Sequence, residues 1–475
     1  MSVSSRKTTL VRLGLASVLA LASWMVVAPV ASAQPPGEGP ALGDRLTQEE
    51  VESGDLSLTE LRREGRRVFS TPFNKLDGYG DGPMNKNDPT SPGGRPSLQD
   101  NGTFLRVNGL DGQTCLECHS IVSNATIPAT FGVGGIGAAS ANAIFQPTDI
   151  DVDDEVGVGY ASFNGRFINP PFLFGSGGIE LLGKEMTEDL QALLAEAKAN
   201  PGQDVELLTK GVDFGTIRFQ DGKLVTDGIE GVDEDLVVRP FGRKGEFPTV
   251  RAFDLEALAF HFGMQPSEVV GKGIDDDGDG VLDEVTAGEI SAMHIFNTTL
   301  ERPRKTQVTE EVQAGFKLFQ SIGCAECHTP ILETRRKELS YCFPEIPERP
   351  FENEFYRVDL SEDPTGFKET KDGGLSVILF ADLKRHDMGD ALAESFGSEL
   401  DRFFTTARLW GVADTAPYLH DGRATTLTEA ILLHGGEAQA ARDNFAGLSD
   451  KDRILVLTML RALRTPSEVG TGLDE

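Results

Sequence analysis

The chain has little cysteine, histidine or tryptophan, and it is short of basic residues. Its 475 residues include 5 cysteines, 7 histidines and 2 tryptophans, and 44 lysines and arginines stand against 75 aspartates and glutamates. No Cys-rich spacing completes a structural zinc set, which argues against a zinc-stabilised fold. The net charge of −31 argues against nucleic acid as a partner. No segment after the N-terminal one is apolar enough to span a bilayer.

Four of the five cysteines stand in two CxxCH pentapeptides, residues 115–119 and 324–328. Two thiols three positions apart can form thioethers to the two vinyl groups of one porphyrin, and the adjacent histidine then reaches the iron. A CxxC disulfide or half of a zinc site is the alternative for each motif. The pattern predicts two covalently bound haem c groups, attached at Cys115, Cys118, Cys324 and Cys327 and ligated by His119 and His328.

The N-terminal segment has the pattern of a secretory signal peptide. Three basic residues precede an apolar run over 13–30, and an Ala-Ser-Ala tripeptide at 31–33 offers a cleavage site. We therefore expect residues 1–33 to be removed and the mature chain to be periplasmic, with no membrane span left. An uncleaved anchor is the alternative. The acidic surface would steer a basic redox protein toward the chain, or serve solubility alone.

The fold class that we predict is mainly α, with two cytochrome c-like haem domains in tandem and long irregular insertions. Thr309 can cap a helix that leads into Cys324, and Ser449 with Asp452 forms the capping pattern of a closing helix. We expect an N-terminal haem domain over 34–270, an acidic linker and helix over 271–304, and a C-terminal haem domain over 305–475.

The first half of the chain is less regular. A capping box at residues 57–60 starts a helix, but roughly 45 residues rich in Gly, Pro, Asn and Asp follow before Cys115. Residues 250–264 have helical spacing and could close this domain, and a further helix is expected over about 287–300. Residues 132–137 satisfy GxGxxG, but no strand precedes them, so we do not expect a nucleotide site.

An acidic segment lies in the predicted linker. Asp275, Asp277 and Asp279 at alternate positions, followed by glycine, match the first half of a calcium loop. A threonine stands where a bidentate glutamate belongs, so Asp283 or a neighbouring glutamate would have to complete the set. A solvated acidic linker is the alternative. The acidic run 149–155 has no such glycine and is expected to be a surface loop.

The histidines outside the two motifs are the candidates for a sixth iron ligand. A capping box at residues 426–429 starts a short helix, and His434 stands at its end before two glycines. A histidine at a helix end beside a tight turn is well placed to reach a haem face. The other four are His261, His294, His386 and His420.

The runs 415–423 and 426–431 resemble the "TAPYFHDG…TLEEAV" segment of the bacterial di-haem cytochrome c peroxidase superfamily. In that family a methionine fourteen positions after the histidine ligates the C-terminal haem, and here that position is His434. The resemblance therefore implies ligation of this haem by His328 and His434. A closer resemblance is to the di-haem oxidoreductase-like branch, described as peroxidases or thiol oxidoreductases. Its motifs stand at 69–74, 77–81, 385–389, 409–411, 419–424 and 434–438.

The resemblance implies a division of labour between two haem groups. The C-terminal haem takes electrons from a small periplasmic redox donor, and the N-terminal haem reduces hydrogen peroxide. Histidine in place of methionine should leave the C-terminal haem less oxidising than in the peroxidases. Two alternatives remain open: an electron-transfer cytochrome without substrate turnover, and a dioxygen-using enzyme, by resemblance to the di-haem rubber-cleaving oxygenases.

Further residues are candidates by their place beside these motifs. His261, on its amphipathic helix, is the candidate catalytic group or distal ligand at the N-terminal haem, and a buried structural histidine is the alternative. His294 has the weaker claim. Cys342 is left without an intramolecular partner, and no nearby cation in the sequence would stabilise a reactive thiolate. At the C-terminal haem we expect Arg385 and Arg423 to pair with propionates. We expect His386 and His420 to lie near this haem and to bond a propionate or a backbone carbonyl, and iron ligation is the alternative for His420.

Overall fold

The computed structural model describes residues 39–80, 113–119, 144–151, 162–305, 307–396 and 399–466. Residues 40–475 form one compact unit. The predicted signal peptide, the glycine-rich run 132–137 and part of the acidic run 149–155 lie outside the described residues. Within the described ranges, no helix combines the length and the apolar character that a membrane span needs.

Capping residues start the helices that precede the two CxxCH motifs. A capping box of Ser57 and Glu60 starts α2 (Leu58–Ser70), and Thr309 caps α7 (Glu310–Ser321). Each cap satisfies a backbone N–H that would otherwise lack a partner. These helix starts confirm the predictions, as do those of α8 and α10. The remaining α-helices are α1 (Gln48–Glu52), α3 (Ser176–Ala199), α4 (Val250–Phe262), α5 (Ser267–Val270), α6 (Ala287–Thr298), α8 (Leu427–Leu432), α9 (Gln439–Gly447) and α10 (Asp450–Leu460).

Two helix pairs are packed closely in the same manner. α2 packs on α6, and α7 packs on α10. A Cβ on Gly65 of α2 would clash with the backbone carbonyl of Ala292, and one on Gly315 of α7 would clash with that of Leu455. Glycine therefore lets each pair of backbones approach. α4, which was expected to close the first domain, packs on α6 and is not the main partner of α2.

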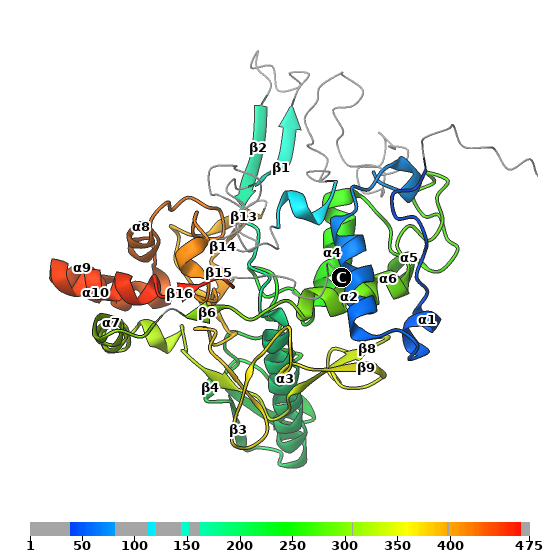
Figure 1. Cartoon of the computed structure of the whole chain (residues 1–475). Coiled ribbons are helices and arrows are strands. Elements are labelled where there is room, and N and C mark those ends of the chain that lie inside the picture. Colours follow the sequence, from blue (N-terminus) through cyan, green and yellow to red (C-terminus); the bar gives the residue numbers. More distant parts are fainter. Residues whose placement is uncertain are drawn as a thin grey trace, which may run out of the picture. The chain divides into compact units, whose positions relative to one another are not determined.

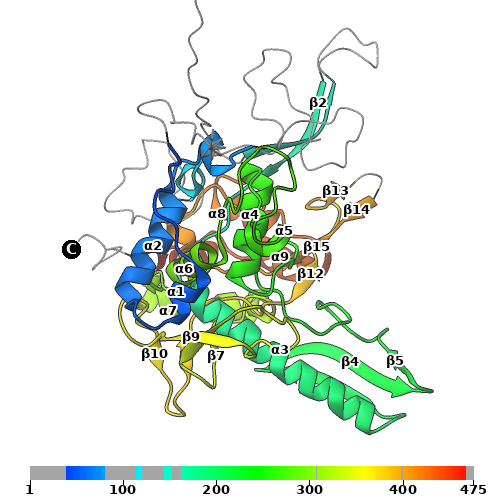
Figure 2. The ribbon, with the colours of Figure 1, turned by 90° about the vertical axis from the view of Figure 1, so that its right-hand side faces the viewer.

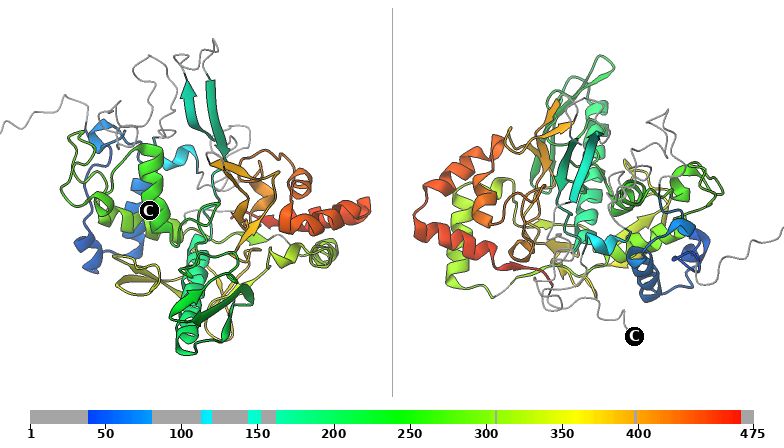
Figure 3. Two further views of the ribbon diagram at one scale, coloured as in Figure 1. Left: turned by 180° about the vertical axis from the view of Figure 1, so that it is seen from behind. Right: turned by 90° about the horizontal axis from the view of Figure 1, so that it is seen from above.

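The two helix groups lie on opposite sides of α3. Figures 1 and 3 show α2, α4 and α6 on one side and α7, α9 and α10 on the other. α3 has 24 residues and packs on the hairpin of β3 (Asp204–Thr209) and β4 (Val212–Gln220). Figure 2 shows this hairpin extending beside α3. The hairpin strand β3 alternates buried and exposed residues along its length.

The expectation of a mainly α protein is wrong, because the described residues also form seven small sheets of two or three strands. Many of these strands have only two or three residues, and some pair with distant segments, as β16 does with β6. Such strands are too short to leave an alternating pattern in the sequence. Besides β3 and β4, the strands are β1 (Ile144–Asp151), β2 (Ser162–Ile168), β5 (Lys223–Val225), β6 (Arg304–Lys305), β7 (Leu332–Glu333), β8 (Glu338–Cys342), β9 (Glu354–Asp359), β10 (Lys368–Glu369), β11 (Leu375–Val377), β12 (Arg385–Asp387), β13 (Glu394–Phe396), β14 (Glu399–Asp401), β15 (Phe403–Thr405) and β16 (Leu463–Arg464).

One apolar core draws on both halves of the chain. It contains Leu61 of α2, Leu181 of α3 and Ile295 of α6, together with Leu339 and Trp410 from the second half. Burying a large apolar side chain stabilises a fold by about 1.5–3 kcal/mol, so this shared core is a substantial link. The domain boundaries near residues 270 and 304 stay a prediction. Two further clusters lie at the close helix pairs, one with Val68, Phe69, Met293 and Phe296 and one with Phe319, Phe380, Val456 and Met459.

Candidate functional site: two haem-binding regions

The C-terminal CxxCH motif directly follows α7. Cys324 begins a single 3-10 turn, η7 (Cys324–Glu326), and Cys327 directly follows it. The N–H of His328 donates to the carbonyl oxygen of Cys324 at 3.0 Å. The ring Nδ1 of His328 lies 3.1 Å from the carbonyl oxygen of Phe380. A carbonyl can only accept, so this hydrogen bond assigns the proton to Nδ1 and leaves a lone pair on Nε2 for a metal.

His434 faces His328. It follows α8, and its Nδ1 lies 2.8 Å from the carbonyl oxygen of Ala430, which favours the same tautomer. The centroids of the two imidazole rings are 6.4 Å apart. With metal–nitrogen bonds of about 2 Å, and about 1 Å from each nitrogen to its ring centre, two axial imidazoles on one iron stand about 6 Å apart. The pair therefore has the separation of two ligands on opposite sides of one iron.

The surroundings of this pair also suit a haem. Burial lowers the pKa of His328 to about 4 and lowers the pKa of His434, so both rings are neutral near pH 7. Neutral imidazole is the form that binds a metal. The apolar cluster with Phe319 and Phe380 borders the motif, and Cys324 packs against it. The donor set and its apolar wall fit a haem between the two histidines.

The N-terminal motif is built like the C-terminal one. Its first three residues form the 3-10 turn η4 (Cys115–Glu117), and Cys118 follows the turn. The ring of Phe69 lies 6.4 Å from that of His119 at an interplanar angle of 53°, and the ring of Phe319 lies 6.4 Å from that of His328 at 50°. α2 and α7 thus supply matching aromatic neighbours to the two motif histidines.

The sixth-ligand side of the N-terminal motif differs. Among the ring contacts of the described residues, none brings a second imidazole to His119 as His434 comes to His328. The buried Nδ1 of His119 finds no hydrogen-bond partner in the described part of the chain. Burial, together with a smaller contribution from repulsion by His261, lowers the pKa of His119 to about 4. His261 is therefore within electrostatic range of the motif, although no ring stacking joins the two.

α4 presents two titratable side chains to this motif. His261 is half-buried near the end of the helix. Asp254, two turns earlier on the same face, is buried and accepts hydrogen bonds from Asn297 Nδ2 at 3.1 Å. Burial raises the pKa of Asp254 well above its usual value, because the charged carboxylate loses its hydration there. Burial raises the pKa of Cys115, and the Asp254 charge raises it further, which places Asp254 near the motif.

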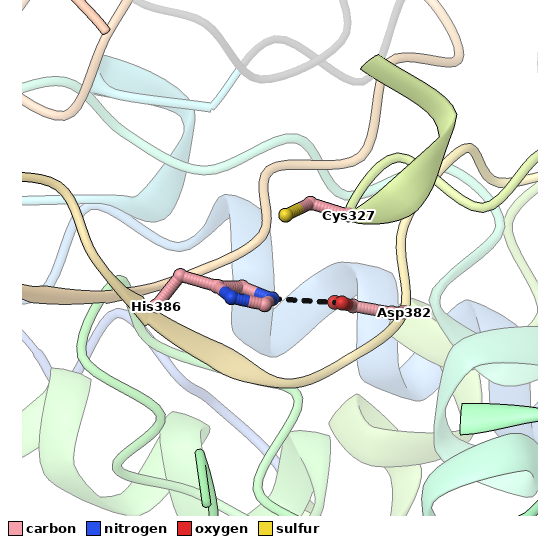
Figure 4. A group of neighbouring side chains, drawn as sticks. All are labelled: Cys327, Asp382 and His386. Atoms are coloured by element: carbon pink, nitrogen blue, oxygen red, sulfur yellow. Dashed lines mark hydrogen bonds and ion pairs between the residues drawn. The ribbon is translucent and has the colours of Figure 1, made fainter. Parts of the chain in front are cut away.

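His386 lies beside the C-terminal motif. Figure 4 shows it with Cys327 and Asp382. Its Nε2 is 2.8 Å from Asp382 Oδ2, and its Nδ1 is 2.7 Å from Glu437 Oε2. Burial alone would lower the pKa of His386, but its hydrogen bonds with Asp382 and Cys327 raise it to about 11. Both ring nitrogens of His386 thus engage side-chain carboxylates, and its predicted contact with the haem stays a prediction.

The other three residues expected at the C-terminal haem have partners in the protein itself. The two arginines form ion pairs with aspartates, and the histidine stacks on a phenyl ring with centroids 4.5 Å apart. Contact with a haem propionate stays a prediction for all three. The partners are Asp233 for Arg385, Asp421 for Arg423 and Phe404 for His420.

His294 and Cys342 lie in a buried polar cluster. His294 Nε2 is 2.8 Å from Glu180 Oε2, and Lys184 Nζ is 3.1 Å from Glu180 Oε1. All three side chains are fully buried and paired, which indicates a structural role for His294. Burial raises the pKa of Cys342 to about 11, although Lys184 opposes the rise, so the thiol stays protonated near neutral pH.

Three of the four predicted calcium ligands come together. Side-chain oxygens of Asp275, Asp277 and Asp279 lie within 4.8 Å of one another. Asp283 does not join them through its Oδ1, which accepts a hydrogen bond from the N–H of Gly273 at 2.8 Å. Calcium binding therefore stays a prediction, with three aspartates as its candidate ligands.

The sequence analysis missed three groups at these sites. Glu437 was overlooked although it stands within the motif at 434–438, so its signal was available. Asp254 lies seven residues before His261, a spacing that puts both on one helix face. Phe380 contributes only its backbone carbonyl, and a backbone atom leaves no trace in side-chain patterns.

Parts of the chain are similar to known proteins. Residues 367–463 match the family described as "Di-haem oxidoreductase, putative peroxidase". The curated cytochrome-c peroxidase IdrP2 of Pseudomonas sp. (strain SCT) is 27% identical over 176 residues, which cover 32% of this chain and 44% of the relative. This chain thus spans less than half the length of that relative. The predicted resemblance to the di-haem oxidoreductase-like branch is confirmed.

Two solved structures are also similar to parts of the chain. Hydrazine synthase of Kuenenia stuttgartiensis is 17% identical, with a TM-score of 0.23, over 38% of this chain and 57% of its own. A MauG-like protein associated with microbial copper homeostasis is 17% identical, with a TM-score of 0.22, over 37% of this chain and 53% of its own. Both TM-scores are too low to define a shared fold.

Proposed function

We propose that the chain, whose residues 367–463 match the di-haem oxidoreductase family, is a periplasmic di-haem c-type cytochrome that acts as a peroxidase. Electrons enter at the C-terminal haem, and hydrogen peroxide is reduced at the N-terminal haem. The family implies haem cofactors. Covalent attachment through the two CxxCH motifs is part of the proposal, and the four cysteine sulfurs would form the thioethers.

The contrast between the two motif histidines carries the proposal. The ring of His328 has a second imidazole, that of His434, at 6.4 Å. Among the described residues, the ring contact of His119 is with the phenyl ring of Phe69, and no imidazole takes the place of His434. An iron with two imidazole ligands suits electron transfer, because no coordination position is open to a substrate. An iron held by His119 alone would keep a position for peroxide, and bound haem would there supply the redox chemistry.

α4 would handle protons at the N-terminal site. Peroxide reduction to two waters consumes two electrons and two protons, so the site needs a proton path. His261 is half-buried and near His119, and burial raises the pKa of Asp254 on the same helix, which favours the protonated form of its carboxyl group. A positioned acid of this kind contributes about 10²–10⁴-fold to a proton-coupled reaction.

The partner that fits this chain is a small basic electron donor. The net charge of −31 would attract a positively charged protein at low ionic strength. Periplasmic location follows from the predicted signal peptide and is part of the proposal. Rates of donor oxidation should then fall as salt is added, because added ions screen the attraction.

Absorption and paramagnetic-resonance spectra of the holoprotein, with and without peroxide, test the proposal. We expect one low-spin ferric signal with two imidazole ligands and one high-spin signal that changes on addition of peroxide. Peroxide-dependent oxidation of a reduced donor should accompany this change. Two low-spin signals that peroxide leaves unchanged would overturn the peroxidase assignment.

An electron-transfer cytochrome without turnover is the second candidate function. The observation that favours it is the closeness of His261 to His119. If His261 bound the second iron, both irons would have six ligands and neither would be open to peroxide. His261→Ala would then convert one low-spin signal to high-spin, whereas under the peroxidase proposal the resting spectrum barely changes.

A further inference from the structure

A side-chain contact ties β12 (Arg385–Asp387) to the residues that follow His434. The carboxylate of Glu437 accepts a hydrogen bond from His386 Nδ1 at 2.7 Å and another from the N–H of Asp387 at 2.8 Å. One carboxylate thus holds two consecutive residues of the strand. It does so three residues after His434.

The other nitrogen of His386 is held as closely. Nε2 lies 2.8 Å from Asp382 Oδ2, and Asp382 is only 3% exposed. Hydrogen bonds between ionised partners are about twice as strong as neutral ones, and burial strengthens them further. The imidazolium ring is therefore a charged bridge between two carboxylates. We call Asp382, His386 and Glu437 the clasp.

The clasp connects both candidate ligands of the C-terminal iron. Asp382 lies two residues after Phe380, whose carbonyl oxygen accepts from His328 Nδ1. Glu437, at the other end, lies three residues after His434. One end of the clasp is thus two residues from the carbonyl group that holds the His328 ring, and the other end is three residues from His434 itself. A shift in the clasp would move one ring relative to the other.

Glycines also let the backbone after β12 come close to the backbone after His434. Gly389 and Gly436 have φ values of +75° and +52°, which favour glycine. A Cβ on Gly436 would clash with the carbonyl oxygen of Asp387, and one on Gly435 would press on that of Met388. The backbone contacts and the clasp therefore join the same two segments, residues 386–389 and residues 435–437, beside His434.

We propose that His386 is a positioning residue, which through the clasp holds His434 opposite His328 and so sets the ligation of the C-terminal iron. The inference rests on the proposed function, since it presumes a haem between the two histidines. Without the clasp, the segment after His434 loses its side-chain bonds to β12, and the bond from His434 to iron competes less well with an added ligand. A role in fold stability alone would leave the ligation of the folded protein unchanged.

The test compares His386→Gln and Glu437→Gln holoproteins with the wild type by paramagnetic resonance and by carbon monoxide binding to the reduced protein. We expect a weaker low-spin signal and about tenfold tighter binding of carbon monoxide at the C-terminal haem, because a charge-assisted hydrogen bond is lost. The double variant should add little to either single one, since both remove the same bridge.

Asp390→Asn is the matched control. It makes the same carboxylate-to-amide change three residues after β12, but it breaks an exposed ion pair with Arg402 and spares the clasp. Both readouts should stay at wild-type values. Should His386→Gln fail to accumulate, Glu437→Gln decides, because its amide oxygen can still accept from Asp387.

The outcomes separate the two proposals. A wild type without the two-imidazole signal overturns the ligation in the proposed function, and the role of the clasp falls with it. A wild type with that signal, together with clasp variants that keep it and bind carbon monoxide no more tightly, overturns the clasp alone.

Discussion

The two CxxCH regions share one proximal scaffold and differ on the other side of the iron. In each, a helix that precedes the motif contacts a partner helix through a glycine, Gly65 or Gly315, and supplies a phenyl ring 6.4 Å from the motif histidine. A second imidazole faces the ring of His328, and its counterpart at His119 is absent from the ring contacts of the described residues.

The difference shows where the chemistry of such a chain is decided. The shared scaffold comes from short stretches of sequence: a capped helix, a glycine, an aromatic residue and the motif itself. The groups that we propose for the far side of each iron come from segments remote in sequence, α4 for one region and the end of α8 for the other. Changes in those remote segments would alter function while the attachment sites stay the same.

Removal of a cysteine pair should have the largest effect. Cys115→Ala with Cys118→Ala should remove about half of the covalently bound haem and all peroxide turnover, and leave the low-spin signal of the other region. Cys324→Ala with Cys327→Ala should remove that signal instead. The mass of the intact chain and its haem content measure both, and Cys342→Ala serves as the control. Equal loss of both haem groups in each variant would break the comparison.

His261→Ala should slow peroxide reduction by about 10²-fold, since it removes a positioned proton donor. The low-spin signal of the C-terminal region should not change. Steady-state rates with a reduced donor measure the effect, and Glu256→Gln, an exposed position on α4, is the control. A wild-type rate in His261→Ala would show that α4 has no part in turnover.

Gly65→Ala and Gly315→Ala should each destabilise the fold by about 1–3 kcal/mol, because the added methyl group meets a backbone carbonyl of the partner helix. Denaturant unfolding measures the loss. Gly447→Ala is the control, since nothing lies within 4 Å of a Cβ at the end of α9. Similar losses at the two close contacts would support the shared scaffold, and a loss at only one would show that the regions are not built alike.

The smallest effect that we expect is a change of stability with pH, caused by the acidic loop before α6. The other partner helix, α10, does not follow such a loop. Burial, together with repulsion from Asp277, Asp279 and Asp275, raises the pKa of Glu284 to about 8. Its protonated form is thus favoured by the fold, so this contribution is complete below pH 4.5 and is lost as the pH rises through 8. We expect stability to fall by about 1–2 kcal/mol between pH 5 and pH 9.

Glu284→Gln should flatten that slope, whereas Asp276→Asn, exposed in the same loop, should keep it. Thermal unfolding at several pH values measures both. Calcium at pH 8 should raise the unfolding temperature if the three clustered aspartates bind it, since the ion would offset their repulsion. A pH profile that Glu284→Gln leaves unchanged would show that this carboxyl group is not the source.

Much of the candidate site was readable from the sequence. The two motifs, the helix caps at Ser57, Thr309 and Thr426, and the position of His434 were all predicted from local spacing, and the structure has the helices where the caps put them. The facing of His328 and His434 was implied by the family resemblance. It is consistent with the ring separation of 6.4 Å.

The rest depended on contacts that local patterns do not record. The mainly α prediction failed because strands such as β12 have only three residues and find partners elsewhere in the chain. The hairpin of β3 and β4 did carry a signal, since Val205 and Leu207 alternate with polar residues ahead of the turn at Lys210 and Gly211. The bond of His386 to Glu437 joins residues that only the tertiary fold brings together.

The core that unites Leu61 and Ile295 with Leu339 and Trp410 has a consequence for timing. Two modules joined by a flexible tether would change their spacing as they swing, and each turnover could wait for a favourable approach. Here the side chains that would have to part are buried together. The electron path between the two proposed cofactors should keep a constant length, so the internal transfer rate should not depend on solvent viscosity.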